Sequence, residues 1–201
     1  FLLSGMRYNL REKELLFNGL SLKYTKDWVR VSQQIKVQKD MIELELKELK
    51  IENLEPSSSF YSQLDINAEK VTINELQIAF RKNKNFDRPP DEYKPTFRGM
   101  INSIPIELNI DSILIQNSAI TYSELGVNKS KSGSIDITDI NASIAGVTNM
   151  PQQQQHVGKA LMKMEALLVG QSRLTTMLSI PYDKDAFSMS VNTTAMDLVK
   201  L

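Results

Sequence analysis

The feature that most constrains this chain is an alternation of apolar and polar residues that changes phase partway along each run. Ile106, Leu108 and Ile110 alternate with polar residues, and Ile113 and Ile115 resume the alternation one residue late. Strict alternation is typical of a strand with one buried face, and a slip of one residue sends the following side chains to the other face. One extra residue, accommodated as a β-bulge, restores the face and bends the strand. The run therefore predicts one long curved strand, or two strands meeting at a corner, whose aliphatic side stays inward.

Three other runs have the same spacing. Their apolar positions are Ile42, Leu44, Leu46, Leu49 and Ile51, then Leu64, Ile66, Ala68, Val71 and Ile73, and finally the shorter set Ile135, Ile137, Ile140, Ala142 and Ile144. Such repetition indicates a sheet built from one recurring unit. We therefore expect a mainly β fold: an elongated, curved antiparallel sheet of repeated bent amphipathic strands, with one or two short helices.

One of these runs allows a second interpretation. Residues 35–54 are rich in Glu, Leu and Lys, which are good helix formers, so an amphipathic helix is the alternative there. The strict alternation of Ile42, Leu44 and Leu46 favours the strand.

The chain is interpreted as a single β-rich segment, residues 1–201, of a longer protein, because it begins with Phe rather than Met. Its parts are N-terminal strands in 1–34, the repeated bent strands in 35–149, and a terminal β meander in 150–201. No run approaches the ~18 apolar residues of a membrane span.

Local signals refine the N-terminal part and the middle of the chain. Asn18-Gly19 predicts a tight turn between two strands. Trp28 is expected to lie at the start of the next strand and to pack in the core. Phe97, Met100, Ile101 and Ile104 have the spacing of a short helix with one apolar stripe, which Pro105 ends.

Two predictions concern the last third of the chain. Gln152 to Gln155 is expected to be an exposed connection. Residues 157–169 fit both a helical stripe and a strand face, so both remain open, with a meander of three strands as the simplest arrangement.

Composition argues against several classes of function. Basic and acidic residues number 24 each, which argues against nucleic acid or another polyanion as the main partner. Cysteine is absent and His156 is the sole histidine. Neither a glycine-rich phosphate loop nor a nucleophile elbow is present. The sequence therefore predicts no enzyme, no catalytic residue, no metal site and no cofactor.

Three stretches of the sequence resemble the AsmA-like family of bacterial envelope proteins: Ile104 to Glu124, Gly133 to Asn149, and the closing Met196 to Leu201. The resemblance implies an upstream helix, outside this chain, that anchors the protein in the inner membrane. It also implies a long periplasmic β-rich body whose curled sheet has an apolar concave face. Members are thought to act in lipid transport or outer-membrane homeostasis, and the family has no catalytic motif to carry over.

Two functions follow from the aliphatic face of the bent strands. In the first, the face stays partly uncovered and forms a trough for phospholipid acyl chains, since shielding apolar surface contributes about 25 cal/mol per Å². The expected lining residues are Leu44, Leu46, Ile66, Ile73, Ile106, Leu108, Ile110, Ile113 and Ile115. In the second, the face is buried in a closed core, and the chain is a structural or protein-interaction module without a lipid ligand. Apolar exposure along the concave face separates the two.

Overall fold

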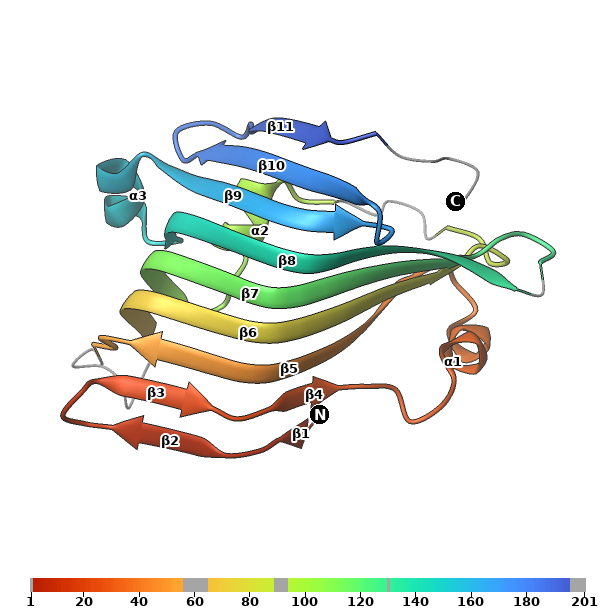
Figure 1. Ribbon diagram of the computed structural model, residues 1–201, viewed down its shortest axis with the longest axis horizontal. Coiled ribbons are helices and arrows are strands. Elements are labelled where there is room, and N and C mark those ends of the chain that lie inside the picture. The colour runs from red at the N-terminus through yellow and green to blue at the C-terminus, as the bar shows by residue number, and fades with distance from the viewer. Residues whose placement is uncertain (1, 56–64, 89–93, 130, 196–201) are drawn as a thin grey trace.

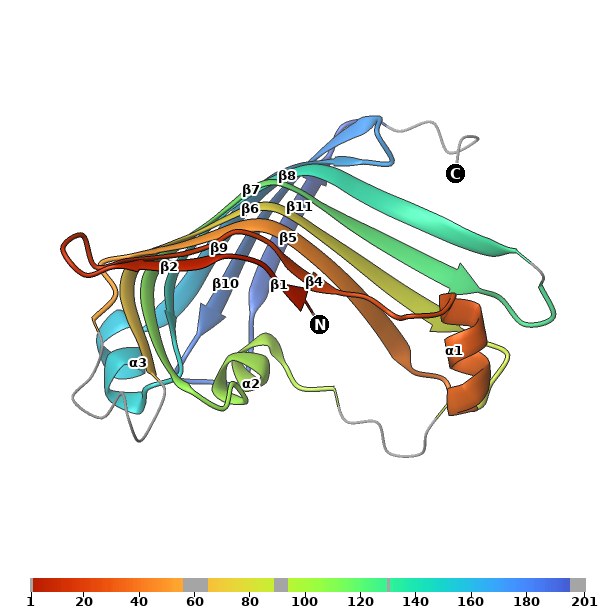
Figure 2. The same cartoon turned by 90° about the horizontal axis from the view of Figure 1, so that it is seen from below.

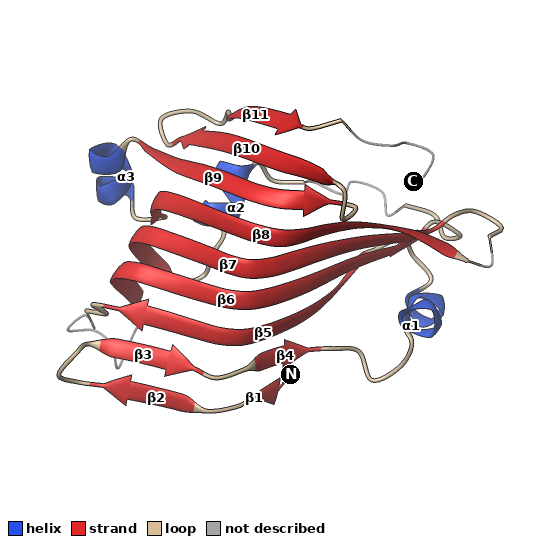
Figure 3. Ribbon diagram, in the orientation of Figure 1, coloured by secondary structure: helices blue, strands red, loops and turns tan. Residues whose placement is uncertain are grey.

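The computed structural model describes residues 2–55, 65–88, 94–129 and 131–195. Within these residues the chain forms one curved, open sheet of 11 strands and three short helices (Figures 1 and 3). With 60% strand and 12% helix, the predicted mainly β fold is confirmed. The strands are β1 (Leu2–Leu3), β2 (Met6–Asn9), β3 (Glu14–Phe17), β4 (Leu20–Leu22), β5 (Asp40–Glu52), β6 (Asp65–Asn83), β7 (Glu107–Leu125), β8 (Ser132–Thr148), β9 (Lys159–Leu168), β10 (Ser172–Pro181) and β11 (Ser188–Thr193). The helices are α1 (Trp28–Ile35), α2 (Phe97–Asn102) and α3 (Pro151–Val157).

The sheet is mixed rather than wholly antiparallel, which corrects one detail of the prediction. From β5 to β11 the strands follow chain order, and β5 pairs on its other side with β3 and β4. The strands β6 and β7 are parallel, with Asp65 opposite Glu107 and Asn83 opposite Leu125. A parallel pair needs a crossover connection, and the chain between β6 and β7 supplies it and carries α2.

Two irregular steps bend the long strands. At the first step, the pairs that Asp111 would form with Glu69 and with Gly146 are missing from the ladders. Gly146 has a positive φ of 70°. The register is nevertheless the same on both sides of the step, because neighbouring strands are interrupted at the same level. Leu108, Ile110 and Ile113 therefore pack in one cluster, so the aliphatic side stays on one face as predicted.

The second step crosses the sheet further along the same strands. Glu75, Asn117 and Asp139 all have φ near 50°, at 53°, 50° and 51°. The β7–β8 register shifts on both sides of Ser118, and the β8–β9 register shifts between Thr138 and Asn141. Side chains satisfy backbone groups there: the Ser118 hydroxyl accepts a hydrogen bond from Leu76 N at 3.0 Å.

The four sequence runs are thus not copies of one bend. The runs in β6 and β7 slip at the first step, whereas those in β5 and β8 slip at the second. The spacing correctly predicted bent strands, but equal spacing does not mean equal position in the sheet.

The two faces of the sheet differ in chemistry. One row of partners runs Leu15, Ile51, Val71, Ile113, Ile144, Met162 and Leu178 across β3 and β5 to β10. The sheet arches, and α2 lies beneath the arch, on the concave side (Figure 2). Because α2 packs against Leu178, the apolar rows form the concave face.

The segment that begins at Trp28 is a helix, not the predicted strand. Asp27 caps it by accepting a hydrogen bond from Val29 N at 3.0 Å. Trp28 itself is 8% exposed and packs with Met41 and Leu125, so the expectation of core packing is confirmed. The cap and this anchor outweigh the strand preference of the β-branched residues that follow.

Asn18-Gly19 does not form the predicted tight turn. The strands on either side, β3 and β4, both pair with β5 in the same direction, so the dipeptide is a joint within one edge of the sheet. Gly19 has φ 100°, and Asn18 N donates to Gly5 O at 2.9 Å. The positive φ of Gly19, which a tight turn often requires, occurs here where β3 is joined to β4.

The last third of the chain holds one helix that was not predicted. Gln152 to Gln155 lie in α3 rather than in an exposed connection, and Gln154 is buried. Its amide donates to Asn102 Oδ1 at 2.7 Å and to Thr148 O at 2.9 Å, which ties α3 to α2 and β8. Residues 159–168 are a strand, and β9 to β11 form the expected meander.

Parts of two predictions lie outside the described residues: the position of Leu64 in the second run and the closing stretch Met196 to Leu201. Among the described residues, none of the helices is long and apolar enough to cross a membrane.

Candidate functional site

The candidate site is the apolar concave face of β5 to β8, which we call the concave wall. It comprises Ile42, Leu44, Leu46, Leu49 and Ile51 of β5; Ile66, Ala68, Val71, Ile73, Leu76, Ile78 and Phe80 of β6; Leu108, Ile110, Ile113, Ile115, Ile120 and Tyr122 of β7; and Ile135, Ile137, Ile140, Ala142, Ile144 and Val147 of β8. The wall is continuous because each irregular step returns the apolar residues to the same face.

Eight of the nine predicted lining residues belong to this wall. Ile66, Ile73, Leu108, Ile110 and Ile113 meet in one cluster, and Ile115 packs in the adjoining cluster around Ile140. Leu44 and Leu46 stand opposite Ile78 and Leu76 of β6. The ninth, Ile106, is half-buried just before β7 begins, and its carbonyl accepts a hydrogen bond from Asn149 Nδ2 at 2.7 Å. The prediction that these residues line a lipid site stays a prediction.

At one end of the strands the concave face is covered, both over β9 and β10 beside the concave wall and over the wall itself. Phe97 and Ile101 of α2 pack over Ala160, Leu178 and Ile180 of β9 and β10. These three residues are only 1%, 5% and 7% exposed. The segment that follows α2 adds Ile104 to the cluster around Leu108 and Ile110. We call this region the covered end.

Polar contacts fasten the covered end. Asn149 Oδ1 accepts from Leu108 N at 2.8 Å, which joins β8 to β7 where their ladder ends. The Tyr182 hydroxyl donates to Gly146 O at 2.7 Å and accepts from Thr148 N at 3.1 Å. Burial raises the pKa of Tyr182 above its usual value, so the hydroxyl stays protonated and can donate at neutral pH.

The opposite end of the concave wall is open. Ile42, Phe80, Tyr122 and Ile135 form one row across β5 to β8. Ile42 is 41% exposed, Tyr122 38% and Ile135 46%, although they point to the same side as the covered residues. Within the described residues no second layer lies over this row. We call this region the open end, and the side chains of Ile42, Tyr122 and Ile135 are exposed there.

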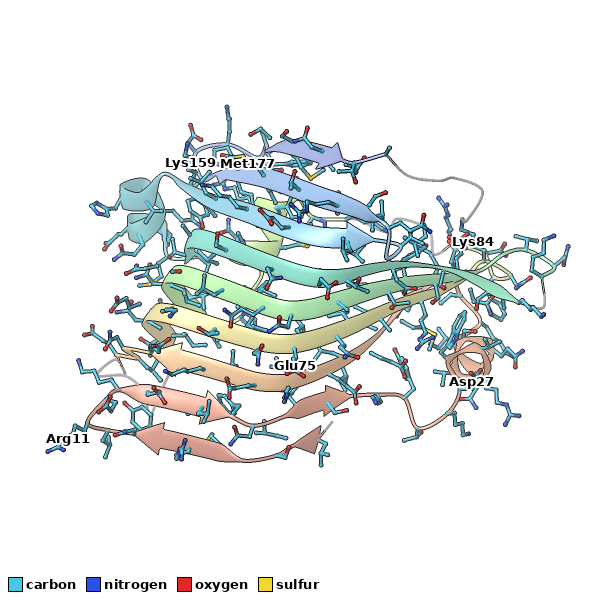
Figure 4. The ribbon with its side chains drawn as sticks, viewed as in Figure 1. Arg11, Asp27, Glu75, Lys84, Lys159 and Met177 are labelled. Carbon is cyan, nitrogen blue, oxygen red and sulfur yellow. The ribbon has the colours of Figure 1, made fainter. Side chains whose placement is uncertain are left out.

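A charged row borders the open end. Asp40, Lys82 and Glu124 stand two residues beyond Ile42, Phe80 and Tyr122 on the same strands, and therefore on the same face. Lys82 Nζ lies 3.0 Å from Asp40 Oδ1, and Lys84 Nζ lies 2.7 Å from Glu124 Oε1. Figure 4 shows Lys84 at the ends of the strands far from α3.

The charged row is linked to the crossover and to the apolar row. Lys94, which follows β6 in the crossover, places Nζ 3.8 Å from Asp40 Oδ2. The Tyr122 hydroxyl donates to Glu124 Oε2 at 2.9 Å. The hydrogen bonds from Lys84 and then from Tyr122 hold the pKa of Glu124 below its usual value, so this carboxylate is charged at neutral pH.

The convex face provides a contrast. Its charges form their own ion pairs, such as Lys50 Nζ with Glu14 Oε2 at 2.9 Å and Arg81 with Glu43 at 3.0 Å. The hydrogen bond that Lys50 donates to the Glu14 carboxylate raises the pKa of Lys50. Glu75 pairs with Lys47 over the middle of this face, which Figure 4 shows toward the viewer. Apart from Met41 and Leu125, which pack against Trp28 of α1, the convex face over the wall is mostly polar, whereas the concave wall is apolar.

The sequence interpretation missed the residues that distinguish the two ends. Phe80 and Tyr122 are not among the predicted lining residues. Tyr122 follows from continuing the alternation of β7 beyond Ile115 with a second slip at Asn117, and Phe80 from the same extension of β6 with a slip at Glu75. Asn favours positive φ and was the available signal.

Within the described ranges, no three His, Asp or Glu side chains gather in a way that could hold a metal ion. A comparison with models of known protein families found no match, and a comparison with curated proteins found none either. The AsmA-like resemblance therefore stays a prediction.

Proposed function

We propose that the concave wall binds the acyl chains of phospholipids, and that the chain is a non-enzymatic groove segment of an AsmA-like envelope protein. In this proposal it acts in phospholipid transport or outer-membrane homeostasis, on the periplasmic side of an inner membrane to which a segment outside this chain anchors it. The observation that carries the proposal is the apolar row at the open end, in which Ile42, Tyr122 and Ile135 are exposed and which continues a buried apolar face.

The physical argument is the cost of exposed apolar surface. Burial of apolar area contributes about 25 cal/mol per Å², and an extended apolar patch on a soluble surface marks a site of interaction. An acyl chain is flexible and aliphatic, and it matches a wall of branched aliphatic residues without needing directional contacts. The uncovered row supports this function over a closed core, in which Ile42 and Ile135 would be buried.

The test is lipid binding by the full chain. Native mass spectrometry of protein purified from cells is expected to detect co-purified phospholipid, and a fluorescent fatty acid is expected to bind the delipidated protein. Ile42→Gln combined with Ile135→Gln should weaken probe binding by about tenfold, because two exposed aliphatic contacts are lost.

The matched control is Met177→Gln. Met177 is 58% exposed, comparable to Ile135, but its partner Lys163 places it on the convex face. Its replacement should leave probe binding unchanged. Absence of lipid from the purified protein together with no probe binding, or equal losses in the control and the double variant, would contradict the proposal.

A further inference from the structure

The ends of the concave wall differ in chemistry, and a bound amphiphile would experience that difference. At the covered end, Ile104 packs on Leu108 and Ile110 of the wall, and α2 packs on β9 and β10 beside it. At the open end, the apolar row gives way within two residues to Asp40, Lys82 and Glu124. A lipid in the trough therefore meets this charged row at the open end.

The charges at that end are of both signs and lie close together. Lys82, Lys84 and Lys94 give three positive charges, and Asp40 and Glu124 give two negative charges, a net charge of +1. The exposed fraction of their side chains ranges from 14% for Lys82 and 30% for Glu124 to 65% for Lys94, so Lys82 and Glu124 are the least solvated. Charged groups in such positions act more strongly than fully solvated ones because water screens them less.

We propose that this charged row is the head-group site for a zwitterionic phospholipid, whose head carries a phosphate and an ammonium group. The lysines contact the phosphate, Asp40 and Glu124 contact the ammonium, and the acyl tails run along the concave wall toward α2. This inference rests on the function proposed above and adds the class of lipid and its direction in the trough.

Complementarity with both signs favours this class of lipid over two others. A head group with a phosphate and no ammonium leaves the two carboxylates facing an anion, which is unfavourable. An uncharged head group forms no charge-assisted hydrogen bonds with the row. The low pKa of Glu124 is consistent with this site, because its carboxylate is available to an ammonium group at neutral pH.

The experiment compares three lipids on the full chain: phosphatidylethanolamine, phosphatidylglycerol and diacylglycerol, each offered in vesicles of an otherwise constant composition. We expect phosphatidylethanolamine to bind about tenfold more tightly than either of the others. Lys82→Gln combined with Lys84→Gln should remove most of that preference and leave diacylglycerol binding unchanged. Unchanged diacylglycerol binding also reports that the variant is folded.

A second variant tests the role of the carboxylates. Asp40→Asn combined with Glu124→Gln should shift the preference toward phosphatidylglycerol, because the repulsion of an anionic head is removed. The control is Lys47→Gln combined with Glu75→Gln, an ion pair on the convex face, which should change nothing.

The outcomes separate the head-group site from the groove. Equal binding of the three lipids by the unmodified chain, or unchanged preference in both charge variants, overturns the head-group site and leaves acyl binding intact. Binding of no lipid at all overturns the proposed function, and the head-group site with it. Glycerophosphoethanolamine should compete with the lipid more effectively than inorganic phosphate does; equal competition would assign the row to free phosphate and overturn the lipid head group.

Discussion

The covered end and the open end of the concave wall carry the same types of apolar side chain, but these side chains are buried at one end and exposed at the other. Ile110 at the covered end is 6% exposed, whereas Ile135 at the open end is 46% exposed. Both are strand isoleucines on the same face of the sheet. The difference is that α2 and the segment after it return beneath one end only (Figure 2). An apolar strand face therefore becomes core or binding surface according to where the crossover lies.

The largest expected effect comes from shortening the same residue at the two ends. Ile110→Ala should lower the free energy of unfolding by about 2–5 kcal/mol, because it leaves a cavity in a packed cluster. Ile135→Ala should lower it by less than about 1 kcal/mol, because its side chain is already half in water. Urea denaturation of both variants measures the contrast, and equal losses would show that the open end is covered in solution.

A second contrast uses two glycines of β8. Gly146, at the covered end, has φ 70°, and a Cβ there would lie 2.5 Å from Val157 Cγ1. Gly146→Ala should destabilise by roughly 1–3 kcal/mol through backbone strain alone, with the contact adding to it. Gly133, at the open end, has no positive φ, and a Cβ added there would meet no other atom within 4 Å. Gly133→Ala should therefore be neutral or stabilise by up to about 1 kcal/mol.

Thermal unfolding followed by circular dichroism compares the two glycine variants. If Gly133→Ala lowered the melting temperature as much as Gly146→Ala does, the loss could not be assigned to the positive φ of Gly146.

A third contrast removes one hydroxyl at each end. Tyr182→Phe leaves Thr148 N and Gly146 O without their partner in a buried site, and should cost about 1–2 kcal/mol. Tyr122→Phe removes one exposed bond to Glu124 and should cost less than about 0.5 kcal/mol. Hydrogen exchange should show faster opening where Tyr182, just after β10, is bonded to β8, and only in the first variant. Similar exchange in both variants would contradict this difference between the two ends.

The smallest expected effect is the pH dependence of the open end. Lys84 and Tyr122 lower the pKa of Glu124 from its usual 4.5, so the unfolded chain holds this proton at a higher pH than the folded chain does. The stabilisation is therefore complete above the usual pKa and is lost as the pH falls through the lowered value. The difference in denaturation midpoint between the unmodified chain and Glu124→Gln should be constant near neutral pH and shrink below 4.5. A difference that grows as the pH falls would contradict the assigned direction.

The sequence predicted the strands well because their signal is local. The alternation of Ile42, Leu44 and Leu46 correctly indicated β5, and the spacing from Phe97 to Ile104 correctly placed α2. A strand was expected at Trp28 because Val29 and Val31 alternate with polar residues as they would in a strand. The segment is a helix instead, because Asp27 caps its N-terminus. The parallel pairing of β6 with β7 had no local signal, since it depends on where the crossover returns.

For the candidate site, the sequence could predict which side chains share one face of the sheet, but not which of them are exposed. Eight of the nine proposed lining residues lie on the concave wall, because the period of a strand fixes which side chains share a side. Which of them are buried depends on where the crossover returns, because Ile104, after α2, packs on Leu108 and Ile110. The charged row at Asp40, Lys82 and Glu124 joins three strands and follows from register, which no single run of sequence specifies.

The single parallel pairing also divides the sheet by sequence distance, and this has a consequence for folding. Partners across β9 and β10 begin only four positions apart, at Leu168 and Ser172, whereas Asp65 and Glu107 are 42 apart. Closing long loops is slower and entropically costlier than closing short ones. We therefore expect β7 to β11 to assemble early as one unit and the pairing of β6 with β7 to form last. The trough then exists only after β6 and β7 have paired.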